Sequence, residues 1–320
     1  MGNLLFSRRC SKLQVLQNFI CIGLIAPALM LAVTKARGQT SVNDDFNSGT
    51  DDGWTRYDPL GTGSWSLNNG TYRIQSAVSP APAQLGPARA GSLRTVETYS
   101  QFYVSVDVEG WDNSLDQIFG LLARTGTPGL GRTSGYGFTY ATQTGRAATG
   151  QLELLVITGE AGDDLSGATA DFTFLPNQSY RMVFTGEVGH LIGKVYSLTN
   201  LATPLVTISG SDSTYASGGV GLFTYDNSPT GLHRADTTFD NFIAMDLPPV
   251  LRIERDPISP DMLLSWPGWA TTYRLERALE LPASPLAWES LGTGFNQIDG
   301  RFVTFDDGTS PASFYRLANP

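Results

Sequence analysis

Strict alternation of apolar and polar residues constrains the fold of this chain more than any other feature of its sequence. Between Phe102 and Glu109 (FYVSVDVE), apolar residues alternate with residues that carry a polar group. Successive side chains of a β-strand point to opposite faces of its sheet, so such a segment forms a strand with one apolar face. No convincing amphipathic helix is present after residue 38.

Similar segments recur along the chain, separated by glycine and polar turn residues. Strands are predicted over Phe102–Glu109, Thr71–Val78, Gln117–Arg124, Gly135–Ala141, Gln151–Thr158, Ser179–Thr185, Leu191–Leu198, Gly219–Tyr225 and Thr237–Met245. A hairpin is predicted with its turn near Glu187-Val188-Gly189. Strands at this spacing predict an all-β fold, an antiparallel jelly-roll β-sandwich rather than an α/β fold.

The segment Leu247-Pro248-Pro249 predicts a boundary between two domains, because proline cannot donate to a strand ladder and stiffens the chain. We therefore expect a large domain over residues 39–246, a linker over 247–250 and a small β-sandwich over 251–320. Six shorter strands are predicted in the small domain: Leu251–Arg255, Met262–Trp266, Thr272–Arg277, Trp288–Leu291, Arg301–Phe305 and Ser313–Leu317. Its large apolar groups are Trp266, Trp288, Phe305 and Phe314. By contrast, the Pro- and Ala-rich segment Ser79–Gly91 is interpreted as a loop.

The first 38 residues have the three parts of a secretory signal peptide. Three basic residues between positions 8 and 12 precede an uncharged, largely apolar stretch over residues 19–33, and Ala36 and Gly38 supply the small residues of a cleavage site. That stretch is shorter than the roughly 20 apolar residues of a spanning helix. We therefore expect cleavage near Gly38, no membrane span in the mature chain, and secretion or a cell-envelope location.

Removal of this segment changes both cysteine content and charge. Cys10 and Cys21 both lie within it, so no disulfide is expected in the mature fold. Five of the 21 basic residues also lie there, which leaves 16 basic against 30 acidic residues and a formal net charge of −14. Such a charge argues against nucleic acid and anionic membranes as partners.

Several short motifs resemble a known family. DDFNSGTDDGWTRYD, GSWSLNNGTYRI, STYASGGVGLFTYDN and TTFDNF, spread between Val42 and Met245, resemble concanavalin A-like jelly rolls, specifically the laminin-G-like or lectin/glucanase-like domains of exported bacterial proteins. The tail, with LLSWPG, TYRLERALEL and a terminal FYRL, resembles a small C-terminal β-sandwich module of exported proteins from Verrucomicrobia-type bacteria. The first resemblance implies carbohydrate binding, adhesion or glycan cleavage, and the fold alone does not choose among them.

The candidate catalytic residues are Asp107, Glu109 and Asp112. Retaining glycosidases on the concanavalin A-like folds that this chain resembles use an E-x-D-x-x-E motif, in which the two catalytic carboxyls lie about 5–5.5 Å apart. Here the order is D-x-E-x-x-D, with the acid types exchanged at every position. The alternative interpretation is that these are solvated acids at a strand end, with Trp111 covering the core.

A structural calcium ion is the predicted cofactor. In jelly rolls of the family that this chain resembles, the first and last strands pair, and by that resemblance Asp45 and Asp240 are its expected ligands. Calcium takes six to eight oxygen ligands, so further carboxylates or carbonyls are needed. The alternative is that both are turn residues that bond their own backbone.

The predicted glycan contacts are Tyr103, Trp111, Arg124 and Tyr140. A sugar site combines an aromatic platform with planar polar groups. Alternation against Phe102 and Phe138 is expected to turn Tyr103 and Tyr140 outward.

The leading hypothesis is an exported module that binds a polysaccharide or a cell-surface glycan, with no intact catalytic signature. One rival is a glycoside hydrolase or lyase that uses Asp107, Glu109 or Asp112. The other is a structural protein of the cell envelope with no small ligand.

Overall fold

The chain is an antiparallel β-protein. The computed structural model describes residues 41–142, 150–255, 261–279, 288–307 and 313–318, so the predicted signal peptide lies outside the described residues. Every strand pair described is antiparallel. The all-β prediction is therefore confirmed.

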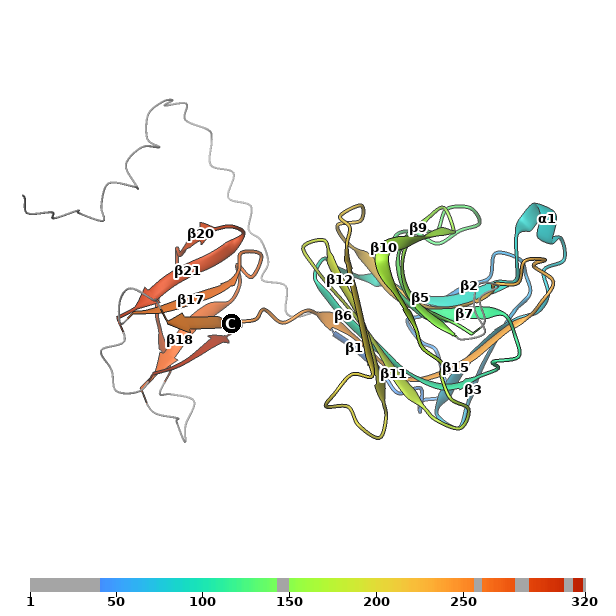
Figure 1. The fold of residues 1–320 in the computed structure, drawn as a ribbon, viewed down its shortest axis with the longest axis horizontal. Helices are drawn as coiled ribbons and strands as arrows, with labels where there is room; N and C mark the ends of the chain where they lie inside the picture. The colour runs from blue at the N-terminus through green and yellow to red at the C-terminus, as the bar shows by residue number, and fades with distance from the viewer. Residues whose placement is uncertain (1–40, 143–149, 256–260, 280–287, 308–312, 319–320) are drawn as a thin grey trace, which may run out of the picture. The chain divides into compact units, whose positions relative to one another are not determined.

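Residues 41–246 form two sheets that lie face to face as two layers (Figure 1). The eight-stranded sheet has the order β13-β12-β11-β6-β15-β4-β3, with β1 also paired to β15. Its strands are β1 (Ser41–Asp44), β3 (Gly63–Asn68), β4 (Thr71–Ser76), β6 (Phe102–Trp111), β11 (Tyr180–Glu187), β12 (His190–Ser197), β13 (Val206–Ser211) and β15 (Ala235–Asp246). The seven-stranded sheet has the order β10-β9-β8-β7-β14-β5-β2. Its strands are β2 (Thr55–Tyr57), β5 (Arg89–Tyr99), β7 (Gln117–Thr125), β8 (Gly135–Ala141), β9 (Gln151–Thr158), β10 (Ala161–Asp171) and β14 (Gly218–Asp226).

Residues 252–318 hold two smaller sheets. One has the order β16-β17-β21-β20 and the other β19-β18-β22. The strands are β16 (Arg252–Arg255), β17 (Met262–Pro267), β18 (Arg274–Ala278), β19 (Glu289–Ser290), β20 (Asn296–Ile298), β21 (Arg301–Asp306) and β22 (Phe314–Ala318). Their core is centred on Leu264, Trp266, Ala270 and Leu275. Phe305, predicted as a large apolar group of this part, is 60% exposed. It pairs with Leu263 and therefore lies on the face of the sheet opposite to the buried Leu264.

We call residues 41–246 the larger part. The apolar face predicted for β6 lies in its core. Phe102, Val104, Val106 and Val108 are fully buried between the two sheets. The predicted hairpin is also present, since β11 and β12 pair from Glu187↔His190 onward. Val188 and Gly189 form its turn with positive φ, the conformation that tight hairpins require.

A stack of three aromatic rings bridges the two sheets. Phe174 lies in the connection between β10 and β11, with its ring 4.0 Å from Tyr140 of β8 and 4.3 Å from Tyr180 of β11, centroid to centroid. The Phe174 backbone N–H donates to the Tyr140 hydroxyl at 3.0 Å. Phe174 therefore links a strand of each sheet, β8 and β11, by packing between them.

The segment Ser79–Gly91 differs from the predicted loop. It contains the short helix α1 (Pro82–Leu85) and the beginning of β5. Pro82 stands at the start of α1, where its missing N–H costs no intrahelical bond. Within the described residues, no helix has the length and apolar character needed to span a membrane.

We predict that Phe174→Ala lowers the free energy of unfolding of the larger part by about 3–5 kcal/mol, because a fully buried ring is removed from between the sheets. The measurement is chemical denaturation followed by tryptophan fluorescence. The matched control is Leu175→Ala, since the neighbouring Leu175 is half exposed. Equal losses in the two variants would contradict a bridging role for Phe174.

Candidate functional site

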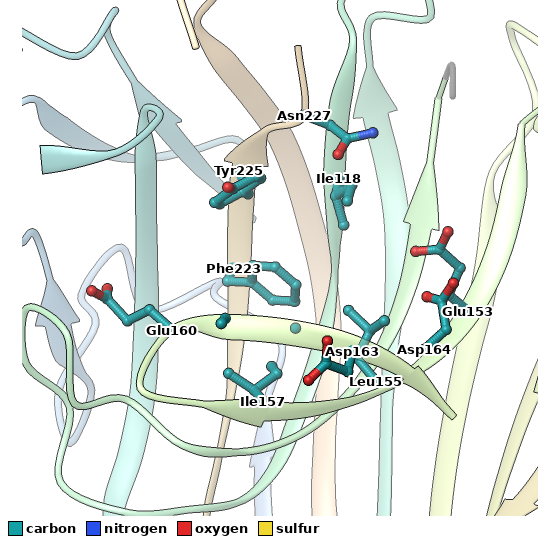
Figure 2. Close-up of a pocket in the computed structure, with 12 residues that line it drawn as sticks. Ile118, Glu153, Leu155, Ile157, Glu160, Asp163, Asp164, Phe223, Tyr225 and Asn227 are labelled. Carbon is teal, nitrogen blue, oxygen red and sulfur yellow. The ribbon is translucent and has the colours of Figure 1, made fainter. Parts of the chain in front are cut away.

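A hollow of about 700 Å³ lies on the outer face of the seven-stranded sheet. On β7, β9 and β14 the lining follows from strand parity, because the neighbours of Ile118, Leu155 and Phe223 along their strands face the core. β10 differs, since it contributes consecutive exposed residues from Ala161 to Asp164. The lining residues are Ile118, Glu153, Leu155, Ile157, Glu160, Ala161, Gly162, Asp163, Asp164, Phe223, Tyr225 and Asn227. We call this feature the outer hollow (Figure 2).

Two aromatic side chains of β14 form one wall of the outer hollow. Val220 and Leu222 face the core, so Phe223 and Tyr225 face outward and remain partly exposed. Figure 2 shows the two rings one above the other on the same strand. Burial raises the pKa of Tyr225, so its hydroxyl stays protonated at neutral pH and can both donate and accept a hydrogen bond.

Carboxylates from β9 and β10 line the other side of the outer hollow. Glu153 of β9 is 7% exposed and accepts a weak hydrogen bond from the Thr139 hydroxyl at 3.5 Å. Asp163 and Asp164 of β10 are exposed. Figure 2 shows these three acids grouped across the hollow from the aromatic rings.

An ion pair fixes the β9–β10 turn against β5. Arg89 donates from Nε to Glu160 Oε1 at 2.9 Å and from Nη2 to Oε2 at 3.0 Å, and the Gly131 N–H also donates to Oε2. Gly159 and Glu160 both have positive φ, as expected of a two-residue hairpin turn. Arg89 is held further by the carbonyls of Leu85 and Pro87. The turn that bounds the outer hollow is thus held in place by a paired, bidentate contact.

Two of the predicted glycan contacts are corrected by their burial. Tyr140 is fully buried and stacks on Phe174, because it lies two residues from Phe138 and therefore shares its inward face. Arg124 is 3% exposed and donates to the carbonyls of Ser100 and Tyr215. Neither side chain presents a surface to a ligand; both stabilise the fold.

Tyr103 faces outward as predicted, but on the opposite sheet from the outer hollow. It lines a hollow of about 220 Å³ on the outer face of the eight-stranded sheet, together with Arg181, Lys194 and Tyr196. Its neighbour Phe102 is fully buried, so alternation gives the correct direction for this residue.

The three candidate catalytic acids are not equivalent. Asp107 is 1% exposed and forms a bidentate ion pair with Arg181, with Nε–Oδ1 2.6 Å and Nη2–Oδ2 2.8 Å. It also accepts from Asn241 at 3.0 Å. These contacts commit Asp107 to the packing of β6 against β11 and β15.

Glu109 and Asp112 line one hollow of about 580 Å³ together with Trp111. Glu109 accepts from the Ser179 hydroxyl at 2.6 Å. The hydroxyl and backbone N–H of Ser114 lower the pKa of Asp112, whereas a general acid needs a raised one. The Trp111 ring packs against Phe174, and its N–H donates to Asn113.

The strand pairing expected to accompany a calcium site is present. β1 pairs with β15, from Ser41↔Met245 to Asp44↔Phe242, so the ends of the larger part lie together. Asp45 accepts from the Asn47 N–H at 3.1 Å and Asp240 from the Asn241 N–H at 2.6 Å, the turn contacts of the alternative interpretation. Among the residues that the structure describes, no three or more His, Cys, Asp or Glu side chains form a group able to hold a metal ion. The calcium site therefore stays a prediction.

Sequence reasoning missed Phe223, Tyr225 and the acids opposite them. The signal was present in Gly221, Phe223 and Tyr225, which occupy the parity opposite to Val220 and Leu222 in a predicted strand. Two aromatic residues on the outward parity of an otherwise apolar strand indicate an outer surface used for contact. Asp163 and Asp164 gave no comparable signal, because β10 was not among the predicted strands. Glu153 lies in a predicted strand, but a single outward acid on a strand does not distinguish a site from a solvated face.

No protein-family model matches the chain, and no curated protein does. Among solved structures, the carbohydrate-binding module CBM66 from Bacillus subtilis is 17% identical, with a TM-score of 0.42 over 59% of this chain and 93% of that one. Lectin II from Ulex europaeus is 11% identical, with a TM-score of 0.45 over 65% and 99%. A galectin-like protein of unknown function from Bacillus subtilis is 12% identical, with a TM-score of 0.46 over 66% and 97%. Likeness at this level carries no argument about ligand or activity.

We predict that Asp240→Asn raises the melting temperature at neutral pH. Burial raises the pKa of Asp240, and the carboxylates of Asp107, Glu109 and Asp45 raise it further. A carboxyl with a raised folded-state pKa costs stability above that pKa, so the gain in the variant should vanish as the pH falls below about 3.9, the ordinary value for Asp. Thermal melts across this pH range measure the effect.

A calcium ion held by Asp45 and Asp240 predicts the opposite result. Asp240→Asn would then lower the melting temperature, and excess chelator would lower that of the unmodified protein but not that of the variant. An unchanged melting curve in chelator, with a more stable variant, would count against the calcium site.

Proposed function

We propose that this chain is an exported carbohydrate-binding protein that holds a polysaccharide or a cell-surface glycan in the outer hollow. The observation that carries the proposal is the pair of outward aromatic rings, Phe223 and Tyr225, facing hydrogen-bonding side chains across an open hollow. The outer hollow has a volume of about 700 Å³, which lies within the usual range for ligand sites, about 300–1,000 Å³.

The chemistry of the lining suits a sugar ring. A pyranose has an apolar C–H face that packs on an aromatic ring, while its edge carries hydroxyls. Carboxylates such as Glu153 and Asp163 accept hydrogen bonds from hydroxyls, and the Asn227 amide donates as well as accepts. The outer hollow offers both kinds of contact to one ligand.

The organisation along the chain agrees with this function. Residues 1–38 would direct export, and 39–246 would carry the ligand site. The prolines of 247–250 would separate the site from residues 251–320, which would attach or sort the protein at the cell surface. A secreted or cell-envelope location follows from this arrangement.

The presence of an aromatic hollow favours ligand binding over a purely structural role in the envelope, because a protein with no small ligand needs no such hollow. A second candidate function is glycan cleavage, favoured by one observation: Glu109 and Asp112 share a hollow with Trp111. Asp107, bound to Arg181, takes no part in either role.

We predict that Phe223→Leu or Tyr225→Leu weakens retention on a bound polysaccharide about fivefold, because leucine keeps apolar volume but lacks the aromatic face, whose contact is worth about 1 kcal/mol. Affinity electrophoresis against a polysaccharide panel measures retention. The matched control is Tyr196→Leu, on the outer face of the eight-stranded sheet, which should bind normally. Loss with Tyr196→Leu and not with Tyr225→Leu would move the site to the Tyr103 face. Absence of retention on every carbohydrate would refute the function.

We predict no release of reducing ends from any polysaccharide that the protein retains. If release is observed, Glu109→Gln is the deciding variant. Abolished release in Glu109→Gln, with retention intact, would establish glycan cleavage in the Glu109–Asp112 hollow and leave the outer hollow as a binding site.

A further inference from the structure

A small pocket adjoins the outer hollow. It has a volume of about 70 Å³ and shares four lining residues with the outer hollow, namely Ile157, Glu160, Phe223 and Tyr225. We call it the side pocket. A cavity of about 150 Å³ is enough to hold a benzene molecule, so the side pocket accepts a group of only a few non-hydrogen atoms. A sugar in the outer hollow can therefore place a small substituent there, but not its ring.

The side pocket lies where a glycine separates two aromatic residues on one face of the sheet. Gly91 of β5 pairs with Tyr57 of β2 on one side and with Phe223 of β14 on the other. Side chains at paired positions point to the same face of a sheet. Because Gly91 has no side chain, it contributes nothing to the space between the two rings, and all three residues line the side pocket.

The walls of the side pocket are largely apolar. Leu93 of β5 and Leu122 of β7 are buried, and they line it together with the partly exposed Ile157 of β9. The two charged residues in its lining, Arg89 and Glu160, form the bidentate ion pair that fixes the β9–β10 turn. A charged group entering the side pocket would lose its hydration while both charges of the wall are already paired. The side pocket therefore fits an uncharged, mainly apolar group.

One polar group of the lining lacks a partner. The Tyr57 hydroxyl is buried, and within the described part of the chain no hydrogen bond involves it. A buried hydroxyl without a partner is destabilising, and a carbonyl oxygen in the side pocket would accept its hydrogen bond. An alkyl group would leave this hydroxyl unpartnered, whereas a sugar hydroxyl would leave Leu93 and Leu122 without an apolar partner.

A small acyl group satisfies both requirements. We infer that the glycan held in the outer hollow bears an acetyl group and that this group occupies the side pocket; the inference rests on the proposed function. The methyl group packs on Leu93 and Leu122, and the carbonyl oxygen accepts a hydrogen bond from Tyr57. Burial of one methyl group is worth about fourfold in affinity, and one neutral hydrogen bond about fivefold. An amide and an ester present the same methyl and carbonyl to the side pocket.

The test uses two pairs of oligosaccharides, titrated calorimetrically into the full chain. The first pair is β-1,4-linked N-acetylglucosamine and β-1,4-linked glucose oligomers of equal length, which differ only in the substituent at C2. The second is acetylated xylan oligomers and the same oligomers after removal of the ester groups. We expect the acetylated member of one pair to bind at least tenfold more tightly; preference in the first pair identifies an amide, and preference in the second an ester.

The size of the acyl group tests the fit. An N-butanoyl form of the first ligand is two methylene groups longer and exceeds the volume of the side pocket. We expect it to bind no better than the glucose oligomer, because a close-packed site does not absorb added methylene groups without strain. Equal affinity for the butanoyl and acetyl forms would overturn the inference, since the group would then lie outside the side pocket.

Tyr57→Phe places the effect in the side pocket. This variant should lower the preference for the acetylated oligomer about fivefold and leave the affinity for its unacetylated partner unchanged. It should not lower the melting temperature, because the hydroxyl that it removes has no partner in the fold. The matched control is Tyr99→Phe: the Tyr99 hydroxyl is also buried without a partner among the described residues, but Tyr99 lines neither hollow. Tyr99→Phe should keep the full preference.

The remaining outcomes separate this inference from the proposed function. Equal affinity within both pairs, lost in Tyr225→Leu, overturns the acetyl inference and leaves the carbohydrate site in place. A preference for acetylated ligands that survives in Tyr57→Phe, or that falls equally in Tyr99→Phe, also overturns it. Binding of none of the oligomers overturns the inference, and the polysaccharide panel then decides the function alone.

Discussion

The stacking of Phe174 between Tyr140 and Tyr180 is the contact on which the larger part of the protein depends. It brings a strand of each sheet onto the two faces of one buried ring, with centroids 4.0 and 4.3 Å away. No cysteine occurs after residue 21, so the sandwich is held by packing and strand pairing. Because the inner faces of both sheets are used in this core, a ligand can bind only on the outer faces or at the strand ends and loops, where the Glu109–Asp112 hollow lies.

The outer face of the seven-stranded sheet carries the candidate site, and the rim of that site is fixed. The Arg89–Glu160 pair holds the β9–β10 turn against β5, and β10 continues from that turn with Asp163 and Asp164. Phe223 and Tyr225 stand opposite on β14. A rigid rim matters for binding, since a preformed site loses less conformational entropy when the ligand enters.

Strand parity explains which predicted side-chain directions agree with the structure and which do not. It gave the correct direction for Tyr103, one residue from the buried Phe102. It was misapplied to Tyr140, which lies two residues from Phe138 and shares its face. The prediction that Arg124 contacts a ligand fails for another reason. Its guanidinium donates hydrogen bonds to the carbonyls of Ser100 and Tyr215, which are distant in sequence.

The sequence by itself determined the all-β class, the core face of strands such as β6, and the hairpin turn near Val188. These features depend on local alternation and on backbone conformation at a few residues. Only the tertiary structure decided where the candidate site lies, because strand order brings Glu153, Asp163 and Tyr225 to one hollow, and β14 joins β7 and β5 from far along the chain. Parity states which way a side chain points, whereas non-local pairing decides what it points toward.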